Sequence, residues 1–246
     1  MQNAALRAVG LSDWRYQLLP VPPALFSETV RALPGAGFRG VNVTIPHKEP
    51  ALALADEASD AARAIGAANM LLFEPDGRMV ADNTDAPALI KAVPVPAAGK
   101  TALVLGAGGS ARAAVWALLD AGAAEVRVWN RHPGRARELT DALGGTPAAG
   151  ASPADLLINC TPAGLDGEGT WFKQLPVNAD EIRMFGCVID FAYGDAETPL
   201  ISAAAARGIP RVDGLELLVG QGALSFERFT GRTAPVEEMQ AAARAG

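Results

Sequence analysis

Cysteine and histidine are scarce in this sequence, which limits the chemistry that it can support. The 246 residues include two cysteines, Cys160 and Cys187, and two histidines, His47 and His132. The cysteines lie far apart and outside any Cys-x-x-Cys spacing, as in a reduced, cytoplasmic protein. Two histidines are too few for a histidine-based metal centre, so we expect no bound metal.

The sequence also lacks a segment of the length and polarity that a membrane requires. Half of the residues are hydrophobic, yet no uninterrupted apolar run approaches the length of a membrane span. The first residues, MQNAALRAVGLSDWR, contain neither the basic nor the apolar region of a signal peptide. A net charge of −6 without a basic stripe argues against a nucleic-acid partner. These absences predict a soluble protein, and they leave monomer and homodimer both open.

A glycine turn between a strand and a helix is the strongest local pattern in the chain. Residues 101–105 are an apolar run of strand formers, a helical pattern starts at Ser110, and a second strand pattern covers 125–130. This order outlines a dinucleotide-binding βαβ unit, in which glycines and helix N–H groups meet a pyrophosphate. A turn with only a structural role is the alternative. The predicted cofactor-binding residues of the turn are Gly106, Ala107, Gly108, Gly109, Ser110 and Ala111.

The end of the second strand indicates which dinucleotide binds. NAD enzymes usually place an acidic side chain there for the ribose hydroxyls, whereas NADP enzymes place arginine near the 2′-phosphate. Here the strand ends in Asn130 and Arg131, Arg135 follows one turn later, and no acidic residue occurs before Glu138. The sequence therefore predicts NADP, with Asn130, Arg131 and Arg135 in its binding site.

The remaining patterns alternate between strands and helices, which predicts an α/β fold with parallel or mixed sheets. We expect two domains with a cleft between them. Residues 1–93 and the C-terminal helices in 214–246 would form one domain, and residues 100–212 a Rossmann-type domain. Further strands are predicted at 15–21, 38–44, 68–73, 78–81, 156–160, 187–191 and 211–213. Further helices are predicted at 1–9, 24–33, 56–65, 86–93, 198–207, 215–229 and 236–243.

Two charged residues in the first part of the chain are candidates for catalysis. Lys48 follows a predicted strand and a proline in a segment with little other charge. Asp85 lies between Asn83-Thr84 and an apolar helix. Each also has an ordinary interpretation, since most lysines are exposed and aspartate often caps a helix.

A series of short motifs supplies the context that single residues lack. In chain order they are 40–48 (GVNVTIPHK), 65–69 (IGAAN), 83–85 (NTD), 106–111 (GAGGSA), 130–131 (NR), 159–164 (NCTPAG), 190–193 (DFAY), 197–200 (ETPL) and 213–221 (DGLELLVGQ). Together they resemble the shikimate dehydrogenase family, over residues 1 to about 231.

That resemblance implies a reversible hydride transfer between NADPH and the C3 ketone of 3-dehydroshikimate, in the biosynthesis of aromatic amino-acid precursors. By match to the family motifs, Lys48 would exchange the proton with the substrate oxygen and Asp85 would orient the lysine. The residues that would contact the substrate are Asn42, Thr44, Asn69, Tyr193 and Gln221. Further residues that would line the cofactor are Asn159, Thr161, Gly164 and Gly214.

One departure from the family concerns the start of the chain. Family members begin with a strand and a Ser-x-Ser-Pro segment, whereas this sequence begins at Met1, inside the following helix. We therefore expect weaker binding of shikimate, a less stable substrate domain, and a start codon assigned downstream of the true one. Two alternative functions stay open: a quinate/shikimate dehydrogenase of the same family, and an NADP-binding protein with impaired substrate binding.

Overall fold

The structure is a computed structural model, and it describes residues 1–163, 171–194 and 196–245. The chain forms two compact units. The first contains Met1–Asp85 and Val219–Gly246, and the second contains Ala86–Leu218. The sequence placed the division between residues 93 and 100, and again near 213. The long helix α9 (Gly214–Thr230) therefore contributes its first residues to the second unit and the rest to the first.

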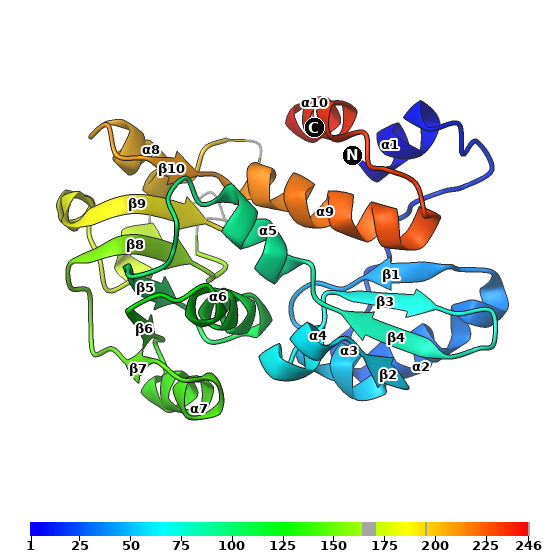
Figure 1. The fold of residues 1–246 in the computed structure, drawn as a ribbon, viewed down its shortest axis with the longest axis horizontal. Coiled ribbons are helices and arrows are strands. Elements are labelled where there is room, and N and C mark those ends of the chain that lie inside the picture. Colours follow the sequence, from blue (N-terminus) through cyan, green and yellow to red (C-terminus); the bar gives the residue numbers. More distant parts are fainter. Residues whose placement is uncertain (164–170, 195, 246) are drawn as a thin grey trace. The chain divides into compact units, whose positions relative to one another are not determined.

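The first unit is built on a four-stranded mixed sheet, drawn in blue and cyan in Figure 1. Its order is β1 (Gly40–Asn42), β3 (Met70–Phe73), β4 (Met79–Asp82) and β2 (Glu57–Ala58). The β1–β3 and β3–β4 pairs are antiparallel, and β2 pairs with β4 in parallel. The β3–β4 hairpin joins the strands predicted at 68–73 and 78–81 and turns at Pro75-Asp76-Gly77. The helices of the first unit are α1 (Gln2–Ala8), α2 (Phe26–Ala32), α3 (Lys48–Leu54), α4 (Asp60–Ile65), α10 (Val236–Arg244) and the greater part of α9.

Two apolar clusters hold this unit together. Phe26 and Val30 of α2 pack with Leu71 and Phe73 of β3. The second cluster joins helices from the two ends of the chain: Leu6 of α1 packs with residues of α9 and α10, including Phe226 and Met239. The burial of these large side chains supplies the main driving force for folding of the unit.

Two predictions in the first unit need correction, and one helix was missed. Residues 15–21 were predicted as a strand but form none, because the side chain of Asn3 bonds both the N–H and the carbonyl of Tyr16. The helix predicted from residue 56 begins at Asp60, where Ser59 caps it, and residues 57–58 form β2 instead. Helix α3, which begins at Lys48, was not predicted at all.

The second unit contains a six-stranded parallel sheet with the order β10-β9-β8-β5-β6-β7. The strands are β5 (Thr101–Leu105), β6 (Glu125–Trp129), β7 (Thr146–Pro147), β8 (Ala154–Asn159), β9 (Phe185–Asp190) and β10 (Arg211–Val212). The chain runs outward from β5 through β6 to β7, then restarts at β8 on the other side of β5. This is the doubly wound order of dinucleotide-binding domains, whose ligands bind where the order reverses. The predicted strands are confirmed, except that β7 was missed.

Helices cover the parallel sheet, as its sequence requires. They are α5 (Asp85–Ala92), α6 (Gly109–Asp120), α7 (Pro133–Leu143) and α8 (Pro199–Ala205), with short 3₁₀ helices at Trp171–Gln174 and Asp180–Met184. In Figure 1, α6 and α7 lie beside the green strands β5 to β7. Strand β5 is almost wholly buried, because both faces of a parallel sheet pack against other elements.

Candidate active site

The first unit contains a buried ion pair between Lys48 and Asp85. Lys48 Nζ lies 2.6 Å from Asp85 Oδ2, and the two side chains are 10% and 7% exposed. The ordinary interpretation of Lys48 as an exposed side chain is therefore wrong. Burying two charges removes them from water at a cost of several kcal/mol per ion. Apolar residues of similar volume would therefore stabilise the fold at least as much as the ion pair does. A buried pair of this kind is therefore weak evidence of a contribution to stability.

The β3–β4 hairpin places a third side chain on this pair. The register that pairs Met70 with Asp82 brings Asn69 alongside Asp85, the first residue of α5. Asn69 Nδ2 donates to Asp85 Oδ1 at 2.9 Å, and Asn69 Oδ1 accepts the N–H of Thr84 at 2.8 Å. Asn83 Oδ1 accepts the N–H of Asp85 at 3.1 Å. Asp85 is thus held through both its backbone and its carboxylate.

Helix α9 brings further polar groups to the same place. Gln221 Oε1 lies 3.4 Å from Asn69 Nδ2. One turn later, Ser225 bonds both Asn42, at the end of β1, and Thr84. Five of the predicted residues, namely Lys48, Asp85, Asn69, Gln221 and Asn42, therefore belong to one hydrogen-bonded network in the first unit. Thr44 is exposed two residues beyond β1.

Four members of this network were missed from the sequence: Tyr16, Asn83, Thr84 and Ser225. Thr84 lies inside the Asn-Thr-Asp motif, and Ser225 follows Gln221 by four residues, a spacing that places both on one helix face. The sequence therefore contained a signal for Thr84 and one for Ser225. Nothing in the sequence near Tyr16 indicates its hydrogen bond to Asn42.

The glycine turn of the second unit joins β5 to α6. Gly106 has φ of 115°, and a Cβ there would lie 3.1 Å from the carbonyl oxygen of Cys160. Gly108 is the N-cap residue of α6 and provides no side-chain cap, and a Cβ there would meet nothing within 4 Å. Ser110 and Ala111, in the first turn of α6, are buried, and Ala107 is half-buried.

Beyond β6 the chain presents two exposed arginines. Asn130 Oδ1 accepts the N–H of His132, which shapes the turn before Pro133 starts α7. Arg131 lies in that turn and Arg135 in the first turn of α7, and both are exposed. The first turn of α7 contains no acidic residue. Both guanidiniums are therefore available to an anion beside the end of β6.

A buried carboxylate joins the ends of β8 and β9. Asp190 Oδ1 accepts Asn159 Nδ2 at 2.8 Å and the N–H of Ala192 at 3.0 Å, and Asp190 Oδ2 accepts the Thr198 hydroxyl at 2.6 Å. Burial raises the pKa of Asp190 to about 6 despite these hydrogen bonds. Asn159 Oδ1 in turn accepts the Thr161 hydroxyl at 2.7 Å. The predicted residues Asn159 and Thr161 are thus hydrogen-bonded to one another, and Asn159 is hydrogen-bonded to Asp190. Asp190 was not among the predicted site residues.

Tyr193 and Gly214 lie together in the second unit. A Cβ at Gly214 would come within 2.3 Å of the Ala192 carbonyl oxygen and 3.0 Å of Tyr193 Cβ, so α9 requires glycine at its first residue. Tyr193 is 46% exposed. Gly164, also predicted to contact the cofactor, lies outside the described residues.

The described residues contain no group of three or more His, Cys, Asp or Glu side chains that could hold a metal ion. Both cysteines are buried, and burial raises the pKa of Cys187 to about 11, which disfavours a reactive thiolate.

None of the helices in the described part of the chain combines the length and apolarity needed to cross a membrane.

Comparison with known proteins identifies the family. Residues 1–71 match the model of the shikimate dehydrogenase substrate binding domain, residues 89–158 that of shikimate/quinate 5-dehydrogenase, and residues 214–244 that of the shikimate 5′-dehydrogenase C-terminal domain. A shikimate dehydrogenase (NADP(+)) of Methylobacterium radiotolerans is 44% identical, over 88% of this chain and 80% of that protein. One from Dinoroseobacter shibae is 42% identical, over 98% and 90%.

Solved structures agree with the sequence relatives. Shikimate 5-dehydrogenase from Thermus thermophilus, in complex with NADP(H) and shikimate, has a TM-score of 0.85 and 37% identity, over 99% of this chain and 92% of that one. A 5-ketofructose reductase from a Gluconobacter strain has a TM-score of 0.84 and 28% identity, over 99% and 91%. The family resemblance seen in the motifs is confirmed: this chain belongs to the shikimate dehydrogenase family.

Proposed function

We propose that this protein catalyses the reversible, NADP-dependent reduction of 3-dehydroshikimate to shikimate. The observation that carries the proposal is the buried Lys48–Asp85 pair, in a chain whose relatives are shikimate dehydrogenases. Sequence relatives at 38% to 44% identity have this activity in their names, and one structural relative was solved with both shikimate and NADP(H). The first unit would bind the substrate and the second the cofactor.

In this proposal Lys48 is the proton donor. Bound NADPH supplies the hydride to the ketone carbon. The ammonium of Lys48 gives a proton to the oxygen on which negative charge develops, and it takes that proton back in the reverse reaction. Asp85 fixes the position of the ammonium through the 2.6 Å contact, and Asn69 fixes Asp85. Asn42, Thr44, Asn69 and Gln221 would hydrogen-bond the substrate hydroxyls, and Tyr193 would lie near the substrate.

The second unit fits a dinucleotide. The N-terminus of α6 has no side-chain cap, so backbone N–H groups at a positive helix end face the glycine turn. Gly106 to Ala111 would hold the pyrophosphate, and Asn130, Arg131 and Arg135 the 2′-phosphate of NADP. Asn159, Thr161, Gly164 and Gly214 would lie on the nicotinamide side. The absence of an acidic residue from the first turn of α7 favours NADP over NAD.

The arginines give a direct test of the cofactor. Arg131→Ala should weaken NADP binding by roughly tenfold to a hundredfold, because it removes charge-assisted hydrogen bonds to the 2′-phosphate. NAD binding should change little, since NAD lacks that phosphate. Titration calorimetry with both dinucleotides measures the two affinities.

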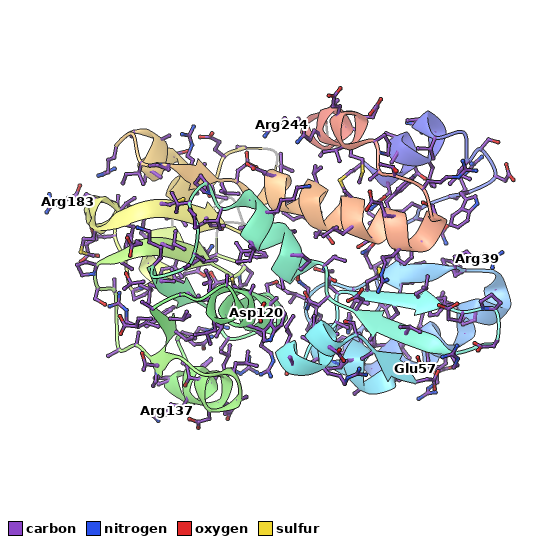
Figure 2. All side chains as sticks on the ribbon, in the orientation of Figure 1. Arg39, Glu57, Asp120, Arg137, Arg183 and Arg244 are labelled. Atoms are coloured by element: carbon purple, nitrogen blue, oxygen red, sulfur yellow. The ribbon has the colours of Figure 1, made fainter. Side chains whose placement is uncertain are left out.

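Arg137 provides a matched control. It lies on α7 two residues beyond Arg135 and points away from the sheet in Figure 2, and it is exposed. Arg137→Ala removes the same charge and should leave both affinities unchanged. Equal losses for NADP and NAD in Arg131→Ala would contradict a contact with the 2′-phosphate.

A steady-state assay tests the function itself. Oxidation of shikimate with NADP⁺ produces NADPH, which absorbance records directly, and parallel assays replace shikimate with quinate or NADP⁺ with NAD⁺. The proposal expects turnover with shikimate and NADP⁺. Faster turnover with quinate would support the quinate/shikimate alternative. NADP binding without turnover of either substrate would support the non-catalytic alternative.

A further inference from the structure

Ser225 lies at the centre of the polar network of the first unit, although it is fully buried on α9. Its hydroxyl is 3.0 Å from the carbonyl oxygen of Gln221, 2.8 Å from Asn42 Nδ2 and 3.2 Å from Thr84 Oγ1. A serine in a helix commonly donates a hydrogen bond to the carbonyl four residues earlier, which explains the contact with the Gln221 carbonyl. It does not explain the other two, which come from residues 183 and 141 positions away.

The direction of these hydrogen bonds follows from counting protons. Ser225 has one hydroxyl proton, and the carbonyl of Gln221 can only accept, so the hydroxyl donates to that carbonyl. Its two lone pairs then accept one proton from Asn42 Nδ2 and one from the Thr84 hydroxyl. Every hydrogen-bonding position of Ser225 is used. The side of the Asn42 amide that faces Ser225 must therefore be its NH₂ group.

The opposite end of the Asn42 amide is also fixed. Asn42 Oδ1 accepts the hydroxyl of Tyr16 at 3.2 Å. The amide is half-buried and is held at both ends, and these contacts use one of its two N–H groups and one of its two oxygen lone pairs. One donor and one acceptor of Asn42 are left for a ligand. Rotation of the amide by 180° would exchange them, and Ser225 opposes that rotation.

Thr84 depends on Ser225 much less. Its hydroxyl lies 3.2 Å from Asn69 Oδ1 and 3.5 Å from Gln221 Oε1, so other acceptors are within reach. The structure gives Asn42 Nδ2 no second acceptor of this kind among the described residues. Loss of the Ser225 hydroxyl should therefore act mainly through Asn42.

We infer that Ser225 is a positioning residue: it fixes the orientation of the Asn42 amide and so determines which group Asn42 presents to the substrate. The inference rests on the proposed function in one respect, because it takes Asn42 to contact shikimate. The orientation itself does not depend on activity and has its own measurement.

The first measurement follows the side-chain amide protons of Asn42 by ¹⁵N–¹H NMR. Asn42→Ala identifies the pair of signals by removing it. In the parent protein we expect slow exchange with water for the proton that faces Ser225. Ser225→Ala should speed that exchange by roughly tenfold or more, since the bond protecting it is lost. Unchanged exchange would overturn the inference, whether or not the protein turns over shikimate.

The second measurement is a double-mutant cycle in catalysis. Ser225→Ala should raise the KM for shikimate roughly threefold to tenfold, the scale of one neutral hydrogen bond, and leave kcat and NADP affinity nearly unchanged. In the Asn42→Ala background the same substitution should have almost no further effect on KM. Additive effects would show that Ser225 acts by another route and would overturn the inference.

Thr230 provides the control. Its hydroxyl also bonds the carbonyl four residues earlier on α9, at 2.7 Å from Phe226 O, and it has no bond to Asn42 among the described residues. Thr230→Ala removes the same helical contact and should leave KM and the Asn42 signals unchanged. A parent protein inactive with shikimate would refute the proposed function alone, and the exchange measurement would then decide the inference.

Discussion

Replacing Lys48 with alanine should lower kcat for shikimate oxidation by roughly 10² to 10⁴, the usual effect of removing a general acid or base. The substitution removes the only group in the proposal that exchanges a proton with the substrate oxygen. Lys48 belongs to the first unit, whereas the glycine turn belongs to the second, so the Kd for NADP should stay close to that of the parent. Steady-state kinetics and calorimetry measure the two quantities.

Two further variants separate chemistry from folding. Lys48→Ala leaves the carboxylate of Asp85 buried without its cation, so a lower melting temperature is expected as well. Asp85→Asn retains the shape of the side chain, keeps Lys48 and should also act mainly on kcat. Lys91→Ala removes an exposed lysine from α5 and should change neither kcat nor stability. Near-parent turnover of Lys48→Ala would exclude Lys48 as the proton donor.

The strands of the second unit could be predicted from the sequence almost completely, whereas helix α7 was not predicted. These strands are short buried runs of apolar residues, and glycines or helix starts follow them directly, so local sequence specifies each element. The strand order could be expected as well, because a glycine turn between strand and helix is typical of one sheet topology. Only β7, two residues long and ending in Pro147, has no such signal.

The first unit was predicted less well, because distant contacts determine it. The apolar residues at 15–21 are compatible with a strand, but Asn3 takes both backbone groups of Tyr16 that a strand would need. Lys48 and Asp85 became candidates together through the family motifs, since 37 residues separate them. Their contact depends on the β3–β4 hairpin, whose register no local pattern fixes to the residue. Nothing in the sequence around Ser225 distinguishes it from other helical serines, because its contact with Asn42 comes from a distant part of the chain.

Asp190 should make the folded state less stable as the pH rises, which is opposite to the usual effect of a carboxylate. Burial is the largest influence on its pKa and raises it from 3.8 to about 6 in the folded protein. Between those values the folded chain binds a proton that the unfolded chain has released. The folded state is therefore favoured at low pH, and its stability falls as the pH rises through about 6. A shift of about two pKa units corresponds to roughly 3 kcal/mol.

Comparison of the parent with Asp190→Asn isolates this effect, because asparagine does not titrate. The free energy of unfolding should be measured in urea from about pH 4 to about pH 7, from amide signals of β8 and β9, the strands that Asp190 joins. We expect the parent to lose roughly 3 kcal/mol relative to Asp190→Asn over this range. Asp141→Asn replaces an exposed carboxylate on α7 and provides the control for the loss of a negative charge. A constant difference between the parent and Asp190→Asn would mean that Asp190 is ionised throughout. The three hydrogen bonds to its oxygens would then outweigh the desolvation that burial imposes.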